Sequence, residues 1–304
     1  MTGPFGIDHP LIATHDISAL RTRLISLGFT MTPVGRHPWG TSTSLAMFQG
    51  CLIEIMGIWD ESLLDENPAG DFRFGRHVHT YLQMREGVAL TALHSTDADA
   101  DAATARAAGL TVAGHLEFGR DVTLPDGRQG RTKTTLALMP NRDFPRLSFF
   151  LCQQHRPDLI YVPEWLEHPN TAHGIAGVTI RAEKADQPAL RAMLCPLYGP
   201  ARDLPGGFSV ATANGTITVL TGARITASFG PLPPDLAAQT DPGIVAMDIR
   251  VSDADKIMAW IGESGLDWRS GVEGVTLTDA ACMGNLFLRF VTSPASVAGG
   301  VSGP

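Results

Sequence analysis

Four segments of the chain repeat one arrangement of apolar and polar positions. Each opens with a glycine and a short apolar run, and the runs are Gly6-Ile-Asp-His-Pro-Leu-Ile, Gly87-Val-Ala-Leu-Thr-Ala-Leu, Gly174-Ile-Ala-Gly-Val-Thr-Ile and Gly243-Ile-Val-Ala-Met-Asp-Ile. A polar cap, an alanine- or leucine-rich stretch and a second glycine follow every run; the second glycines are Gly28, Gly109, Gly199 and Gly265. A nearly constant internal spacing indicates a repeated structural unit. We therefore expect four related modules.

Within a module the pattern predicts one strand, one helix and three further strands. In the first module the helix is expected near 17–27, with Asp16 or Ser18 as its N-cap and Gly28 at its end. The strands of this module are expected at 6–14, 29–34, 43–48 and 51–58. In the second module we expect strands at 88–94, 111–118, 131–139 and 147–153, with a helix over 98–108 that Asp97 caps.

The four modules fall into two pairs, which predicts two domains. The first domain is expected over 1–156, with modules 6–58 and 87–155, and the second over 173–295, with modules 174–222 and 243–292. Residues 157–172 contain three prolines and are interpreted as a linker. The predicted fold class is α+β: four βαβββ modules arranged as two domains, each an open curved mixed sheet around a cleft.

Composition narrows the possible partners and the compartment. The chain has 304 residues and a formal net charge of −8, which argues against a phosphate-binding face for nucleic acid. It has no apolar run of the length needed to span a membrane, and its N-terminus lacks the pattern of a signal peptide. Its four cysteines are scattered without a CxxC spacing. These features favour a cytoplasmic protein that binds neither nucleic acid nor membranes, and a homodimer is possible.

Candidate chemistry is concentrated in the first module. The fourth position of the repeated run is His9 in this module and an apolar residue or glycine in the others. Glu54 stands inside the apolar run Cys51–Met56, where an unpaired carboxylate would be costly to bury. An imidazole and a carboxylate together suit Fe, Mn, Zn or Ni. Alternatively, Glu54 pairs with a nearby Arg or His, and His9 is a core histidine whose hydrogen bonds are satisfied.

These residues together resemble a known family. The resemblance rests on the module order, the opening Gly-Ile-Asp-His, the Leu27-Gly-Phe29 that follows the helix, and the acid Glu54. It also rests on the loop His37-Pro-Trp-Gly-Thr41 and the segments Ser148–His155 and His168-Pro-Asn170. The module order, the opening run, the Leu-Gly-Phe and the acid are similar to the vicinal oxygen chelate superfamily, which includes glyoxalase I, extradiol dioxygenases, epimerases and bleomycin-resistance proteins. Within it, the first module, the loop and the two later segments resemble the glyoxalase-like domain group.

The resemblance implies metal ligands on the first and last strands of paired modules. It assigns His9 and Glu54 to two ligand positions, while Leu90, at the corresponding position of the second module, cannot ligate. The last strand of that module offers Cys152, Gln153 or His155, and His155 is the favoured third ligand. The second domain has no matching ligands and is expected to lack metal.

The remaining candidates are substrate-binding residues: His37, Trp39, His94 and Gln153. The resemblance implies a metal-dependent isomerase, lyase or epimerase that acts on a small oxygenated molecule in the N-terminal cleft. In this hypothesis a divalent metal chelates neighbouring oxygens of the substrate, and Glu54 serves as a ligand or as the catalytic base. One alternative is a metal-free binding or sequestering protein, with a cleft lined by Trp39, Trp59 and Phe48. A second alternative is a dioxygenase.

Overall fold

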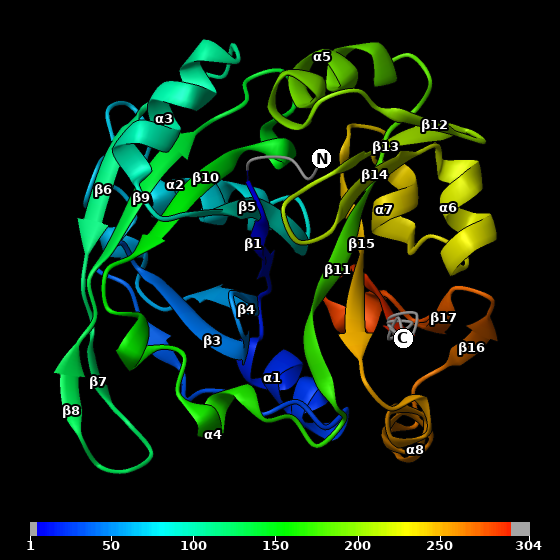
Figure 1. Cartoon of the computed structure of the whole chain (residues 1–304), viewed down its shortest axis with the longest axis horizontal. Helices are drawn as coiled ribbons and strands as arrows, with labels where there is room; N and C mark the ends of the chain where they lie inside the picture. Colours follow the sequence, from blue (N-terminus) through cyan, green and yellow to red (C-terminus); the bar gives the residue numbers. More distant parts are fainter. Residues whose placement is uncertain (1–4, 293–304) are drawn as a thin grey trace, which may run out of the picture.

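Two curved eight-stranded sheets form the framework of the protein. The computed structural model describes residues 5–292 (Figure 1). The first sheet has the order β2-β3-β4-β1-β5-β10-β9-β6, and the second has the order β12-β13-β14-β11-β15-β18-β17-β16. In each sheet the first strands of two modules pair antiparallel at the centre: β1 with β5 and β11 with β15. The predicted fold class is therefore confirmed, with two curved open sheets built from paired βαβββ modules.

The first sheet and its helices come from residues 7–154. Its strands are β1 (Ile7–Ala13), β2 (Gly35–Arg36), β3 (Thr41–Phe48), β4 (Cys51–Ile58), β5 (Gly87–Ser95), β6 (Gly114–Phe118), β9 (Thr134–Met139) and β10 (Phe149–Gln154). The helices are α1 (Ile17–Ser26), α2 (Phe74–Leu82) and α3 (Ala98–Ala107). A separate hairpin is formed by β7 (Asp121–Thr123) and β8 (Gln129–Arg131).

The second sheet repeats this plan. Its strands are β11 (Ala172–Arg181), β12 (Arg202–Leu204), β13 (Gly207–Ala211), β14 (Thr216–Leu220), β15 (Gly243–Val251), β16 (Trp268–Gly271), β17 (Gly274–Leu277) and β18 (Phe287–Thr292). The helices are α5 (Gln187–Tyr198), α6 (Gly222–Phe229), α7 (Pro234–Ala238) and α8 (Ala254–Ser264). Within residues 5–292, no helix is both long and apolar enough to cross a membrane.

Local signals in the sequence fix the ends of the helices. The side chain of Asp16 accepts a hydrogen bond from the backbone N–H of Ala19, and that of Asp97 accepts one from Ala100, so both predicted N-caps are present. The four repeated glycines Gly28, Gly109, Gly199 and Gly265 all have positive φ angles, which a residue with a side chain rarely adopts. Each repeated glycine thus turns the chain from a helix back towards the sheet.

The strand predicted at 29–34 is wrong. Only a two-residue strand, β2, forms just after it, and the backbone N–H of Thr32 makes a single bond to the carbonyl of Leu45. Pro33 interrupts the segment and cannot donate to a ladder. The sequence pattern therefore placed the strand too early.

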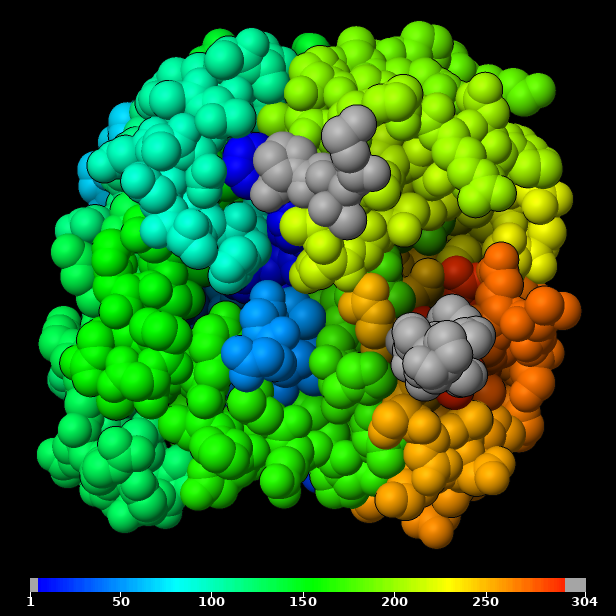
Figure 2. All heavy atoms as spheres, viewed as in Figure 1, coloured from blue at the N-terminus to red at the C-terminus, as the bar shows by residue number. Residues whose placement is uncertain are grey.

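One continuous apolar core joins the two halves. It contains Ile7 and Ile53 from the first sheet, Leu24 from α1, and Val178 and Ile257 from the second half. In Figure 2 the blue-to-green half and the yellow-to-orange half pack side by side. Because the halves share this core, each one stabilises the strands of the other.

The concave faces of the two sheets are filled differently. In the second half, Phe229 of α6 and Leu236 of α7 pack with Phe287 of β18 in an apolar cluster, and the Phe229 and Phe287 rings lie 5.8 Å apart. In the first half, α2 packs Phe74 and Val78 into the concave face but leaves a cavity beside it. The predicted linker covers this side of the first sheet, because α4 (Pro163–Leu166) packs against β3.

Candidate functional site

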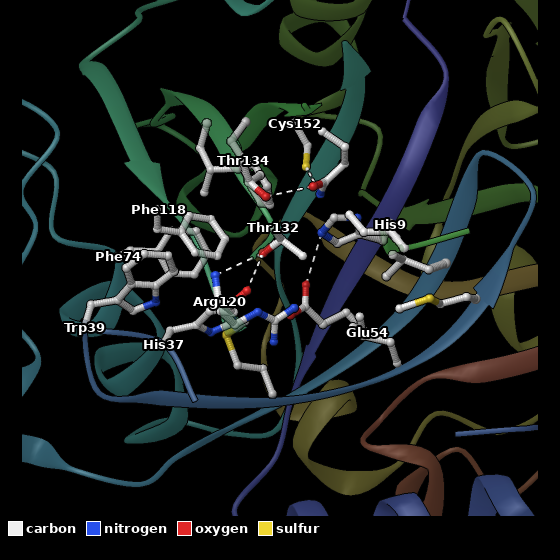
Figure 3. A pocket seen from close by; sticks show the side chains of 18 residues that line it. His9, His37, Trp39, Glu54, Phe74, Phe118, Arg120, Thr132, Thr134 and Cys152 are labelled. Carbon is white, nitrogen blue, oxygen red and sulfur yellow. Dashed lines mark hydrogen bonds and ion pairs between the residues drawn. The ribbon is translucent and has the colours of Figure 1, made fainter. Parts of the chain in front are cut away.

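A cavity of about 60 Å³ lies in the concave face of the first sheet (Figure 3). We call it the inner cavity. Its polar lining includes His9, Glu54, His37, Arg120 and Gln154. Its apolar lining is aromatic and aliphatic, with Trp39, Phe74, Phe118, Phe150, Leu136 and Ile160 among its members. A larger outer cavity of about 890 Å³ shares His37, Phe118, Arg120 and Thr132 with it and leads outward past the β7–β8 hairpin.

A β-bulge at the start of β1 positions the first polar pair of the site. Ile7 pairs with Leu93 and His9 pairs with Ala92, so Asp8 is the extra residue of the bulge. The carboxylate of Asp8 is buried and lies 2.6 Å from Nδ1 of His9. This contact fixes the orientation of the ring, so Nε2 of His9 points into the inner cavity.

Glu54 meets His9 from the neighbouring strand. β4 runs parallel to β1 with Glu54 opposite Leu11, which places the two side chains on one face of the sheet. One oxygen of Glu54, Oε2, lies 3.1 Å from Nε2 of His9, and the other, Oε1, accepts a hydrogen bond of 2.5 Å from the Thr43 hydroxyl. The expected convergence of His9 and Glu54 is therefore present in the structure.

The charges of this group stabilise one another. Burial opposes ionisation of Glu54, but the hydrogen bond and charge of His9 outweigh it and lower the pKa of Glu54 to about 2. Burial also disfavours the His9 cation, but Asp8 and Glu54 on its two sides raise the pKa of His9 to about 9. At neutral pH the site therefore holds an imidazolium between two carboxylates.

An aromatic wall stands across the cavity from this pair. The ring of His37 stacks on Trp39, with centroids 4.7 Å apart, and Phe118 meets His37 edge-on at 5.5 Å. Nδ1 of His37 lies 2.9 Å from the Thr41 hydroxyl. Burial, followed by the charge of Arg120, lowers the pKa of His37 to about 3, so this ring is neutral. His37 and Trp39 thus line the cavity, and their role in substrate binding stays a prediction.

Three other sequence candidates lie away from the inner cavity. Nε2 of His155 lies 2.8 Å from the Thr135 hydroxyl, near the end of β10, and does not join His9 and Glu54. The Gln153 side chain accepts the backbone N–H of Ala98 at the start of α3 and donates to the carbonyl of Thr96. Nδ1 of His94 lies 3.4 Å from Asp8, so His94 reaches His9 only through that carboxylate.

Comparisons with known proteins fit this architecture. A family model described as "Glyoxalase-like domain" matches residues 7–194, more than half of the chain. The chain belongs to the glyoxalase-like domain family. The match covers the first sheet and extends into the first module of the second half, so it includes every lining residue of the inner cavity. No curated protein matches.

Several solved structures share this fold at low sequence identity. A hypothetical protein from Staphylococcus aureus has a TM-score of 0.67 at 12% identity, covering 95% of this chain and all of that chain. A mutant 4-hydroxymandelate synthase from Streptomyces coelicolor has a TM-score of 0.60 at 13% identity, covering 96% of this chain and 93% of that chain. A xylose isomerase-like TIM barrel/4-hydroxyphenylpyruvate dioxygenase fusion protein has a TM-score of 0.59 at 11% identity. The match covers 98% of this chain and 50% of the fusion protein.

The resemblance of the sequence to the vicinal oxygen chelate superfamily implies a metal site. His9 and Glu54 offer two donors, but the second glyoxalase-like module places apolar residues at the corresponding positions. Leu90 replaces His9 in the repeated run, and Phe150 replaces Glu54, because Phe150 pairs with Ala92 as Glu54 pairs with Leu11. Within residues 5–292 no group of three or more His, Cys, Asp or Glu side chains is placed to hold a metal ion. Protein metal centres usually take three or four such ligands, so these residues do not fit one.

Two residues of the glyoxalase-like site were missed from the sequence. Asp8 lies next to His9 in the repeated run, and an acid in an apolar strand could have drawn attention to it. Arg120 lies between β6 and β7, in a loop with no pattern of its own, and reaches the cavity only because the hairpin folds over it. Its backbone N–H bonds the Thr132 hydroxyl at 3.0 Å, which ties the loop to the cavity wall.

Proposed function

We propose that the protein is an enzyme that moves a proton on a small oxygenated molecule bound in the inner cavity, without a resident metal. The observation that supports it is the contact of 3.1 Å between His9 and Glu54, both buried, in the wall of a cavity. Strongly shifted ionisable groups in a cavity are typical of catalytic acids and bases. Isomerase or lyase chemistry of this kind needs one acid and one base at the same carbon–oxygen unit.

In the proposed step Glu54 is the base and His9 is the acid. A carbon–hydrogen bond next to a carbonyl group breaks, its proton passes to the Glu54 carboxylate, and the electron pair moves onto the carbonyl oxygen. Nε2–H of His9 then donates a hydrogen bond to that oxygen, or a proton, while Asp8 holds the imidazolium from behind. In an α-hydroxycarbonyl substrate, His9 gives its proton to that oxygen, and an enediol forms. Glu54 then returns its proton to the former carbonyl carbon, while the α-hydroxyl group returns a proton to His9 and becomes the carbonyl group, so the isomerisation neither gains nor loses atoms.

Substrate binding would itself make Glu54 a stronger base. In the free protein, the His9 contact is the main reason that the pKa of Glu54 is low. A substrate oxygen that takes the Nε2–H of His9 removes that hydrogen bond from Glu54. Burial, which raises the pKa of a carboxyl group, is then less opposed, so the proton affinity of Glu54 increases. The base is thus weak until a carbonyl compound occupies the cavity.

Proton–deuterium exchange tests this proposal directly. The protein, treated with a chelator, is incubated in D₂O with a panel of small ketones, aldehydes and oxo acids, and loss of α-hydrogen signals is followed by NMR. We expect exchange of at least one compound that is lost in Glu54→Gln and His9→Ala. A stoichiometric divalent ion in the purified protein, lost in both variants, would instead establish a metal centre and overturn the metal-free step.

A second candidate function is binding or sequestration without turnover. It is supported by the aromatic lining of Trp39, Phe118 and Phe150, which resembles a binding pocket more than a reaction centre. The same panel separates the two functions. Tight binding of a compound that shows no exchange, in the wild type and in Glu54→Gln alike, would favour the binding protein.

A further inference from the structure

Two polar donors in the cavity wall lack any partner. Nε of Arg120 and Nε1 of Trp39 are both buried and make no hydrogen bond in the part of the chain that the structure describes. Arg120 also forms no ion pair within residues 5–292. A buried donor without an acceptor is costly, and a buried charge without a counter-charge is more so. Both residues line the same inner cavity.

The protein groups described near Arg120 do not bond its Nε. Glu54 is the acid whose charge acts on the guanidinium, but the contacts of its two oxygens are with Thr43 and His9. Burial lowers the pKa of Arg120, as expected of a cation that has lost water and gained little in return. In Figure 3 the Arg120 side chain extends towards Glu54 across the cavity.

The fold keeps space for this guanidinium. A side chain at Gly35 would bring its Cβ to 2.7 Å from Nη1 of Arg120, so the guanidinium would have to shift to accept it. Arg120 lines the outer cavity as well as the inner one, and it therefore stands where a ligand passes from one to the other. Arg120 therefore places the N–H donors of its guanidinium on the route between the inner cavity and solvent.

We propose that Arg120, with Trp39, binds the carboxylate of a small carboxylic acid whose apolar part lies against Phe118 and His37. Arginine presents paired N–H donors that match the two oxygens of a carboxylate. A carboxylate adds one negative charge to a site that already holds Asp8 and Glu54, whereas a phosphate dianion would add two, which is more costly. This inference rests on the proposed function and names the class of its substrate, which is an oxygenated carboxylate rather than a neutral carbonyl compound.

Binding of benzoate and of its uncharged analogue benzamide tests the inference. Isothermal titration calorimetry measures the affinity of wild type, Arg120→Met and Arg120→Lys for each compound, with Arg128→Met as the matched control. Arg128 is an exposed arginine of the β7–β8 hairpin that pairs with Asp126 and lines neither cavity, so its variant removes the same charge from the protein. We expect about a ten-fold or larger loss of benzoate affinity in Arg120→Met, consistent with loss of a hydrogen-bonded charge pair.

The other variants and ligands give further tests of the inference. Arg120→Lys should retain part of the affinity, Arg128→Met should retain all of it, and phenyl phosphate should bind more weakly than benzoate. Equal affinity of wild type and Arg120→Met for benzoate, with both proteins folded, would overturn the inference, and so would equal affinity for benzamide and benzoate. The titration is repeated with Glu54→Gln, in which the proposed proton transfer is abolished. Benzoate binding by this variant tests the carboxylate site separately from the proposed reaction.

Discussion

The side-chain amide of Asn214 bonds both backbone groups of Ile7. Its oxygen accepts the Ile7 N–H at 2.8 Å, and its nitrogen donates to the Ile7 carbonyl at 2.9 Å. Asn214 lies between β13 and β14 in the second half, whereas Ile7 immediately precedes the Asp8-His9 pair. Arg250 supports the Asn214 loop through its carbonyl, at 2.6 Å. The second half, whose own concave face is filled, thereby holds the strand that carries the site.

Replacing Asn214 should weaken both the fold and the site. Asn214→Ala leaves two buried backbone groups of Ile7 without partners, which costs about 1–3 kcal/mol. We expect a loss of unfolding free energy of that size in urea titrations, together with a changed NMR signal of the His9 ring. Ser209→Ala on neighbouring β13 is the control, since the Ser209 side chain makes no hydrogen bond in the described structure. Equal stability of the two variants would contradict a clamping role.

The fold could be predicted from the sequence because its signals are local and repeated. Apolar runs and glycines such as Gly28 recur in each module, and aspartate N-caps such as Asp16 and Asp97 begin the first helix in three of them, so the patterns supported one another. The segment 29–34 failed because Pro33 limits its pairing, and pairing depends on the neighbouring strand rather than on the segment itself.

The site was only partly predictable, for a similar reason. His9 and Glu54 were found because alternation along two adjacent strands places them on one face. The same alternation puts Cys152 and Gln154 in the cavity wall, so Gln153, which lies between them, faces away. The contribution of Arg120 depends on how a loop folds over the cavity, and no periodic pattern encodes that.

Asp8 should control the ionisation of His9. Asp8→Asn keeps the shape of the side chain but removes the charge 2.6 Å from Nδ1. Loss of a close opposite charge should lower the pKa of His9 by about 1–3 units, from a starting value of about 9. NMR titration of the ring measures the shift, and the His168 signal in the same spectra is the internal control. An unchanged His9 titration would show that Glu54 alone sustains the cation.

The stability of the protein should depend on pH through the His9–Glu54 pair. The raised pKa of His9 contributes stability that is complete below its ordinary value of 6.5 and is lost as pH rises through about 9. The lowered pKa of Glu54 contributes stability that is complete above its ordinary value of 4.5 and is lost as pH falls through about 2. The contribution of the pair is therefore largest between these two ordinary values.

A double variant isolates this contribution. His9→Asn/Glu54→Gln removes two of the three buried charges together and leaves Asp8 with His94, 3.4 Å away, as its remaining partner. Urea unfolding across the pH range should give a flatter stability profile for the double variant than for wild type. Each single variant, by contrast, should lose about 3–5 kcal/mol at neutral pH because a charge stays buried without its partner. Parallel wild-type and double-variant profiles would mean that other groups set the pH dependence.

Thr43 should set the proton affinity of Glu54. Its hydroxyl donates a hydrogen bond of 2.5 Å to Oε1, and Thr43→Val removes that bond while conserving shape. Because the bond stabilises the carboxylate, its loss should raise the pKa of Glu54 and cost about 1.5–3 kcal/mol at neutral pH. Ser44→Ala on the same strand is the matched control, since its hydroxyl bonds the carbonyl of Thr32 instead. In acid titrations of the unfolding free energy, the fall in stability should begin at a higher pH in Thr43→Val than in Ser44→Ala. If the unfolding free energies of the two variants fall over the same acidic pH range, His9 alone holds Glu54 in its ionised form.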